Sequence, residues 1–399
     1  MKRMSSKATL AIVLIATGVI QAVTVQAAQD EPQLLKTELG TVGGQSSEGT
    51  AINDRGQVAG TSESSEGAFH AFFWDHGKIT DIPPLRGFDS YTNTLNNRGQ
   101  VLGYFNAGPS GEEHAFLWER GTTIDLGTLG GAYSLPPAPG LRALNDHGQA
   151  VVDSTTAEGA WRAAVWQNGK MTSLGTLPGG TFSTVSAINN RGQVVGSSQT
   201  AAGENHAFLW DNGTMFDLGT LGGTSSSARA VNDDGQVVGD SLTASGERHA
   251  FLWTDGTMID LGTPGSISYA LGINRRGQVL VYTESGAIRR TSLWEDGTKT
   301  DLGTLPGRTS AIGYALNDRG QVVGNSFTLG EASPSSAFLW QGGTMIELSR
   351  LQGGDVSLAF DVNQHGDVTG WSSAGRDDYP RQHGVLWTHR RGEIRRGGR

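Results

Sequence analysis

The stretch Thr220–Gly262, which reads TLGGTSSSARAVNDDGQVVGDSLTASGERHAFLWTDGTMIDLG, decides the fold. Four short runs in it are rich in apolar residues, and polar connections that contain glycine separate them. The two tightest connections are Asn232–Gly235 and Thr254–Gly256. Asn, Asp and Gly tolerate the positive φ angles that tight hairpin turns require. The stretch therefore predicts an antiparallel meander of four strands, over 228–231, 236–241, 248–253 and 258–261.

The same pattern recurs eight times along the chain. Each copy holds an Asn-x-x-Gly tetrad, and consecutive tetrads begin 42 to 49 residues apart. The tetrads begin at Asn53, Asn96, Asn145, Asn189, Asn232, Asn274, Asn317 and Asn363. A tryptophan follows in every copy, at Trp74, Trp118, Trp166, Trp210, Trp253, Trp294, Trp340 and Trp387. We predict that the tetrad builds a turn, with glycine in the left-handed conformation, and that the tryptophan packs between neighbouring copies.

A period of about 40 to 50 residues with four strands per copy is typical of a β-propeller. The third run, His249–Trp253, is apolar on both faces, so neighbouring units must cover both. Residues 34–44, LLKTELGTVGG, match the end of a fourth strand, which the last copy lacks. We therefore predict an all-β fold, a single β-propeller over 33–390 with eight four-stranded blades, closed into a ring by an N-terminal strand. Seven blades is the alternative, if one copy forms no blade.

The N-terminus has the pattern of an export signal. Three cations, Lys2, Arg3 and Lys7, precede an apolar run over 8–20, and Val25–Ala27 offers small residues at the cleavage positions. We predict a signal peptide over 1–27, a short linker over 28–32 and a secreted protein, periplasmic or extracellular. An uncleaved anchor is the alternative. Residues 391–399 are predicted to form a basic C-terminal tail.

The composition argues against several classes of protein. The chain has 399 residues, a net charge of −9 and no cysteine. An acidic chain neutralises phosphates poorly, so we expect no nucleic-acid partner. Without cysteine there is neither a disulfide nor a thiolate metal site. We expect no cofactor, no metal, no membrane span after signal cleavage, and a monomer.

Three repeated features have a chemical alternative to their structural interpretation. The oxygens of Asn232–Asp234 could ligate calcium, but the copy with Asn274–Arg276 places cations there. Residues such as His249 could ligate a metal, but their strand should lie away from the axis, so we predict a hydrogen bond between blades. Gly239–Leu242 spells the motif of a serine hydrolase family. Its Ser241 recurs as a strand position, however, and no strand-to-helix turn follows it.

The repeated strings resemble a known family. HAFLW, at His206–Trp210 and His249–Trp253, occurs together with INDRGQVVG-like and DLGTLGG-like strings. In this order they resemble the bacterial HAF repeat family, described as an extracellular repeat. The resemblance covers about 34–387 and departs in the third and sixth copies, at Arg162–Trp166 and Arg290–Trp294. It implies export and carries no established chemistry.

The connections that do not repeat are the candidates for recognition. In a meander, the connections from the second to the third strand and from the fourth strand to the next unit share one face, which we call the variable face. One of its connections, over 133–140, is enlarged. We predict that ligand contacts come from Tyr133, Trp161, Phe327, Arg376 and Tyr379.

The predicted function is that of a non-catalytic scaffold that binds an extracellular protein or polysaccharide. One alternative is a propeller-type glycan-active hydrolase or lyase. It would need acids at the central channel, which Glu112, Glu113 or Asp361 could supply from loops. The other alternative is a structural protein of the envelope or cell surface.

Overall fold

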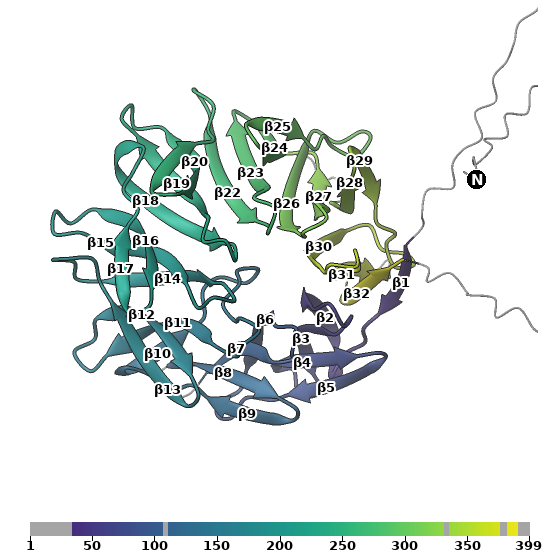
Figure 1. Ribbon diagram of the computed structural model, residues 1–399. Coiled ribbons are helices and arrows are strands. Elements are labelled where there is room, and N and C mark those ends of the chain that lie inside the picture. Colours follow the sequence, from purple (N-terminus) through teal and green to yellow (C-terminus); the bar gives the residue numbers. More distant parts are fainter. Residues whose placement is uncertain (1–33, 107–110, 331–334, 376–380, 390–399) are drawn as a thin grey trace, which may run out of the picture.

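The computed structural model describes residues 34–106, 111–330, 335–375 and 381–389. These residues form eight four-stranded antiparallel sheets, arranged in a ring as the blades of a β-propeller (Figure 1). The prediction of eight blades is confirmed, and the alternative of seven is wrong. The predicted signal peptide, linker and tail lie outside the described residues. Within those residues, no helix is long and apolar enough to cross a membrane.

In each blade, a first strand borders the centre of the ring and a fourth strand lies at the rim (Figure 1). The first strands of blades 1 to 8 are β2 (Gly43–Ile52), β6 (Ser90–Leu95), β10 (Gly130–Leu135), β14 (Ser183–Ile188), β18 (Gly222–Val231), β22 (Ile267–Ile273), β26 (Ser310–Leu316) and β30 (Ser357–Val362). The second strands are β3 (Val58–Ser64), β7 (Val101–Asn106), β11 (Ala150–Thr156), β15 (Val194–Gln199), β19 (Val237–Thr243), β23 (Val279–Ser285), β27 (Val322–Phe327) and β31 (Val368–Ala374). The third strands are β4 (Phe69–Asp75), β8 (Glu113–Glu119), β12 (Trp161–Gln167), β16 (Asn205–Asp211), β20 (Arg248–Thr254), β24 (Ile288–Glu295), β28 (Ser336–Gln341) and β32 (Arg381–Thr388). The fourth strands are β5 (Lys78–Ile82), β9 (Thr122–Asp125), β13 (Lys170–Gly175), β17 (Thr214–Asp217), β21 (Thr257–Asp260), β25 (Thr298–Asp301), β29 (Thr344–Glu347) and β1 (Leu35–Glu38).

The first strand of blade 5 is longer than the sequence predicts. Strand β18 begins at Gly222, six residues before the expected start at Ala228. Two irregularities in its pairing with β19 interrupt the alternation of apolar residues. The added residues are glycine, threonine and serine. Ser226 is buried, and its hydroxyl accepts a hydrogen bond from the Ala207 amide of blade 4, which satisfies a polar group inside the protein. A pattern of apolar residues cannot signal a strand of this kind.

The ring is closed by the N-terminal strand, as predicted. Strand β1 pairs antiparallel with β32 and completes the eighth blade, so both ends of the described chain meet there (Figure 1). The next residue, Leu39, donates its amide to the carbonyl of Gly384 at 2.9 Å. Its side chain is buried beside Leu386 of blade 8 and Trp74 of blade 1. This closure pairs the edge of β32, which would otherwise be open to other strands.

The repeated asparagines link all eight blades. Each carboxamide oxygen accepts the amides two and four residues later, at 2.9 to 3.1 Å, and so shapes its own turn. Each carboxamide nitrogen donates to the main-chain oxygen of the next asparagine, at 2.8 to 3.1 Å. The last of these bonds runs from Asn363 to Asn53 and closes the circle. The predicted turn role is confirmed, and the link between blades is an additional role that the sequence did not reveal. Among the described residues, no group of three or more His, Asp or Glu side chains could hold a metal ion.

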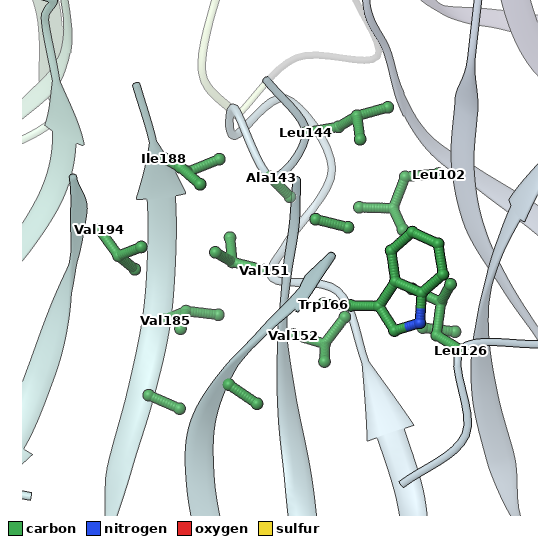
Figure 2. Packing of buried hydrophobic residues seen from close by; sticks show 14 of the residues in the cluster. Leu102, Leu126, Ala143, Leu144, Val151, Val152, Trp166, Val185, Ile188 and Val194 are labelled. Carbon is green, nitrogen blue, oxygen red and sulfur yellow. The ribbon is translucent and has the colours of Figure 1, made fainter. Parts of the chain in front are cut away.

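The repeated tryptophans form the core between blades, as predicted. Each of them belongs to an apolar cluster that spans neighbouring blades. Figure 2 shows Trp166 of blade 3 packed beside Leu102 and Leu126 of blade 2. The ring of Trp118 lies 4.9 Å from that of Phe73 in the preceding blade. These contacts cover the third strands on both faces.

The histidine that precedes the tryptophan in five of the eight copies acts within its blade, so the predicted bond between blades is wrong. His70, His114, His206 and His249 each bond through Nδ1 to an aspartate on the adjacent fourth strand, at 2.9 to 3.1 Å. His383 makes the equivalent bond to Glu38 on β1. The partner lies on the next strand of the same sheet, where cross-strand pairs are within reach.

Candidate functional site

Blade 3 departs from the repeat within its first strand, and not in the connection before that strand, where the sequence led us to expect the enlargement. Residues 130–135 form β10, and the chain leaves the sheet only after Leu135. Strand β10 pairs with β11 only as far as Leu135, which lies opposite Asp153. Pro136 and Pro137 follow, and proline cannot donate the hydrogen bond that a continued strand needs. The chain rejoins the sheet at Leu144, opposite Ala150. This insertion accounts for the longest interval between tetrads, 49 residues.

The inserted segment is anchored to the blades on either side. The carbonyl of Pro137 accepts a hydrogen bond from the buried side chain of Asn93 in blade 2, at 2.6 Å. The carbonyl of Arg142 accepts the amide of Ile188 in blade 4, at 2.8 Å. The segment therefore has a fixed position, which suits it to form the wall of a binding site.

An open groove of about 770 Å³ lies between this segment and blade 4. We call it the blade 3 groove. Its apolar lining includes Pro136, Pro137, Trp161 and Phe182, and its polar lining includes Asp153 and Thr184. An apolar concavity with a few converging polar groups is the usual form of a ligand site.

The structure brings two of the five predicted contact residues together. The rings of Tyr133 and Trp161 lie 6.0 Å apart, and the indole of Trp161 lines the groove while 37% of this residue stays exposed. Phe327 lies at the end of β27 in blade 7, away from the groove. The other two predicted residues, Arg376 and Tyr379, lie outside the described residues.

A second group of aromatic side chains lies on the variable face, at blades 1 and 2. Phe69 begins β4, and its ring is 6.2 Å from that of Tyr91 on β6. Tyr91 is in turn 5.1 Å from Tyr104 on β7. The tyrosine pair recurs in blade 6, where Tyr269 lies opposite Tyr282 with the rings 6.3 Å apart. Phe69 takes the position that Trp161 holds in blade 3, five residues before the repeated tryptophan, so aromatic residues at this part of the face are shared by some blades and not by all.

Asp153 is the chemically distinctive group of the groove. One of its carboxylate oxygens, Oδ1, accepts the amide of Val185 in blade 4 at 2.7 Å. Burial raises the pKa of Asp153 to about 7, and this one hydrogen bond only partly opposes the effect. The carboxyl group therefore changes its charge near neutral pH.

We predict that Asp153 makes the protein less stable as the pH rises. Its pKa is higher in the folded chain than the ordinary value of 3.8, so the folded state binds the proton more tightly. The stabilisation is complete below about pH 4 and is lost as the pH rises to about 7, by about 1 kcal/mol per pH unit. In urea unfolding at a series of pH values, the free energy of unfolding of Asp153→Asn should rise relative to that of the wild type as the pH increases across this window. A constant difference between the two proteins would contradict the raised pKa.

The central channel is a second concave region. It has a volume of about 150 Å³, and the asparagine turns and Asp361 line it. Asp361 lies on strand β30 and not on a loop, which corrects the sequence-based expectation. Its carboxylate accepts the amides of Ile52 at 2.9 Å and Val362 at 2.8 Å, and burial raises its pKa to about 6. Asp361 thus joins blade 8 to blade 1, while Glu112 and Glu113 lie away from the channel, at the third strand of blade 2.

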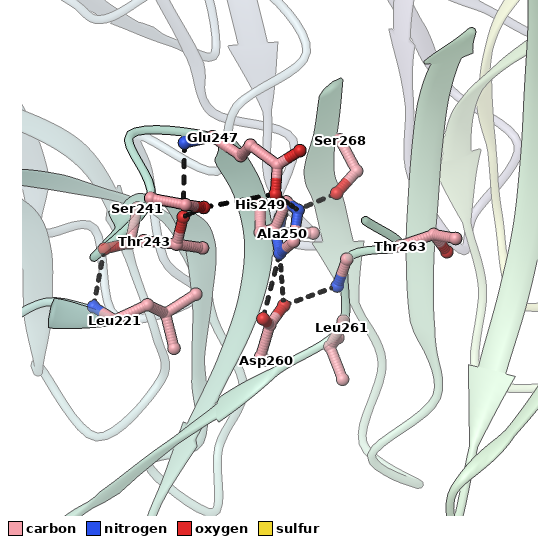
Figure 3. Close-up of polar contacts among 12 residues, drawn as sticks. Leu221, Ser241, Thr243, Glu247, His249, Ala250, Asp260, Leu261, Thr263 and Ser268 are labelled. Carbon is pink, nitrogen blue, oxygen red and sulfur yellow. Dashed lines mark hydrogen bonds and ion pairs between the residues drawn. The ribbon is translucent and has the colours of Figure 1, made fainter. Parts of the chain in front are cut away.

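Three residues of blade 5 have the identities of a hydrolase triad but not its hydrogen bonds. Ser241, His249 and Asp260 lie on adjacent strands, and the imidazole Nδ1 bonds to Asp260 at 2.9 Å (Figure 3). Ser241 is fully buried, however, and its hydroxyl accepts the amide of Leu221 at 2.9 Å and donates to main-chain carbonyls. The imidazole Nε2 has no hydrogen-bond partner among the described residues. A triad needs an accessible serine bonded to the imidazole, so this serine is structural, as the sequence predicted.

The most unusual member of the site, Asp153, is not among the residues that the sequence predicts to bind. Two signals in the sequence nevertheless point to it. Only Asp153 and Asp240 place an acid just before the repeated serine of the second strand. The interval that contains the insertion is also the longest of the seven.

The chain matches no protein-family model, and no curated protein matches it in sequence. Solved structures share its fold. The β-propeller domain of the Trilobed protease from Pyrococcus furiosus is 10% identical with a TM-score of 0.51, and 76% of this chain covers 98% of that one. Acylaminoacyl peptidase from Pyrococcus horikoshii is 11% identical with a TM-score of 0.50, and 84% of this chain covers 58% of that one. The chain thus spans a little over half the length of that peptidase, and the likeness shows the class of fold, a β-propeller, alone.

Proposed function

We propose that this chain is an exported, non-catalytic scaffold that binds an extracellular protein or polysaccharide through its variable face. The observation that carries the proposal is the blade 3 groove, with a partly exposed Trp161 and a half-buried acid, Asp153, beside a fixed wall. The aromatic groups of blades 1 and 2 extend the same face. Export rests on the N-terminal signal pattern and on the resemblance to the HAF repeat family.

A scaffold role is also supported by how the repeated polar residues are used. The repeated asparagines hold the blades together, the histidines join the third strand to the fourth, and serines such as Ser241 bond to the main chain. Their functional groups are committed to the fold. The residues that differ between blades are the ones left to contact a partner.

We predict that Trp161→Ala lowers the affinity for the partner by about tenfold or more, because an exposed aromatic residue at the centre of a site is a typical hot spot. The purified protein is first screened on arrays of polysaccharides and of protein fragments, beside a general hydrolase screen. The matched control is Phe216→Ala, which removes a ring that is 50% exposed on the outer strand of blade 4.

Binding without turnover that depends on Trp161 and not on Phe216 would support the proposal. Turnover of an arrayed polymer would favour the glycan-active alternative. No binding on either array would contradict the proposal and favour a structural role in the envelope.

A further inference from the structure

Blades 3 and 5 carry an acid at the same position of the second strand. Asp153 lies opposite Ala163, and Asp240 lies opposite Ala250. The side chain two residues before that alanine is on the same face of the sheet. In blade 5 this neighbour is Arg248, and in blade 3 it is Trp161.

The carboxylates of Asp240 and Asp153 differ in their partners. Burial raises the pKa of Asp240. The ion pair with Arg248 opposes this effect, and the charge of Arg229 also lowers the pKa. Among the described residues, no cation is paired with Asp153, whose partner is the amide of Val185. A buried carboxylate without a counter-ion is costly. Blade 5 supplies its own cation, whereas blade 3 has an open groove at that place.

The other charged side chains near the groove do not fill this role. Arg162 lies opposite Ser154, and so on the other face of the sheet from Asp153. Its guanidinium donates to the carbonyl of Thr181 at 2.5 Å and to that of Trp161 at 2.9 Å. Glu158, in the connection between β11 and β12, is acidic and exposed.

We propose that the blade 3 groove is a guanidinium site, which takes an arginine side chain of a protein partner between Asp153 and Trp161. The ligand's guanidinium corresponds to that of Arg248 in blade 5. This inference rests on the proposed function, and it narrows the partner to a protein with an exposed arginine.

Arginine suits the groove better than lysine does. Its planar guanidinium can stack on the indole of Trp161 and bond to a carboxylate at the same time. An ammonium is more strongly hydrated and cannot bond in the same bidentate way. The apolar wall at Pro136 and Pro137 can cover the aliphatic part of an arginine side chain.

The test measures binding of a capped peptide, acetyl-Gly-Arg-Gly-amide, to the purified protein by calorimetry. The same peptide with citrulline in place of arginine is a neutral match in shape, and a lysine peptide tests the preference for guanidinium. We expect the arginine peptide to bind at least tenfold more tightly than the citrulline peptide. Asp153→Asn should weaken the arginine peptide by about 30-fold or more, because it removes one partner of a desolvated charge pair.

Two further variants separate binding from folding. Trp161→Arg rebuilds the arrangement of blade 5, so it should abolish peptide binding while the protein becomes more stable at pH 8. Asp240→Asn removes the paired acid of blade 5 and should leave the peptide affinity unchanged. The asparagine of Asp153→Asn can still accept the Val185 amide, so this variant should fold.

Equal affinity for the arginine and citrulline peptides would overturn the guanidinium site. So would undiminished binding by Asp153→Asn, or no binding of the arginine peptide by the wild type at millimolar concentration. If the partner found on the arrays needs Trp161 but not Asp153, the proposed function stands and this inference fails. If the arginine peptide binds as expected while no arrayed polymer does, the inference stands without the broader function.

Discussion

A chain that begins at Gly40 should lose at least about 3–5 kcal/mol of its free energy of unfolding, relative to one that begins at Gln33. The shorter chain lacks β1 and Leu39, and burial of a leucine alone is worth about 2–5 kcal/mol. It also lacks the antiparallel pairing from Leu35↔Thr388 to Glu38↔Val385. The measurement is urea unfolding of both chains.

The shorter chain should also self-associate, because the edge of β32 becomes available to other strands. Analytical ultracentrifugation of the two chains tests this consequence. A shorter chain that is monomeric and as stable as the longer one would show that β1 does not close the ring.

Trp387→Ala should destabilise the protein by about 3–5 kcal/mol, the usual cost of removing a buried tryptophan. This side chain has no exposed surface, and it packs in the cluster that joins blades 7 and 8. Its indole N–H donates to the carbonyl of Ser349 at 2.8 Å, so the variant also leaves this acceptor without its donor. Urea unfolding at fixed pH measures the loss.

Trp161→Ala is the matched control, because it makes the same chemical change at a tryptophan that does not repeat and is partly exposed. It should cost less than about 1 kcal/mol. A similar loss in both variants would contradict the division between repeated residues that build the fold and unrepeated residues that bind.

The repeated part of the fold could be predicted because its signals are local. An Asn-x-x-Gly tetrad such as Asn232–Gly235 specifies a turn through its own four residues, and eight such tetrads at a regular spacing specify eight copies. The match of 34–44 to a fourth strand was enough to predict how the ring closes. The bonds from one asparagine to the next depend on how blades stack, which no single copy encodes.

The site was harder to predict because it depends on one copy differing from another. The sequence singles out Tyr133 and Trp161 as unusual residues of expected connections; they lie on strands β10 and β12 instead, and their rings do lie together. Asp153 resembles the paired Asp240 in sequence, and only the missing cation beside it sets it apart. That contrast requires the register of β11 with β12 and the path of the inserted segment.

The most direct test of the blade 3 site is the pKa of the Asp153 carboxyl, measured by carbon NMR on aspartate-labelled protein with Asp153→Asn for assignment. We expect a pKa near 7 in the protein alone. Saturating arginine peptide should lower this pKa by at least one unit, because a bound guanidinium favours the charged carboxylate. The citrulline peptide should leave it unchanged. A pKa near 4 in the protein alone, or no response to the arginine peptide, would rule out the guanidinium site at Asp153.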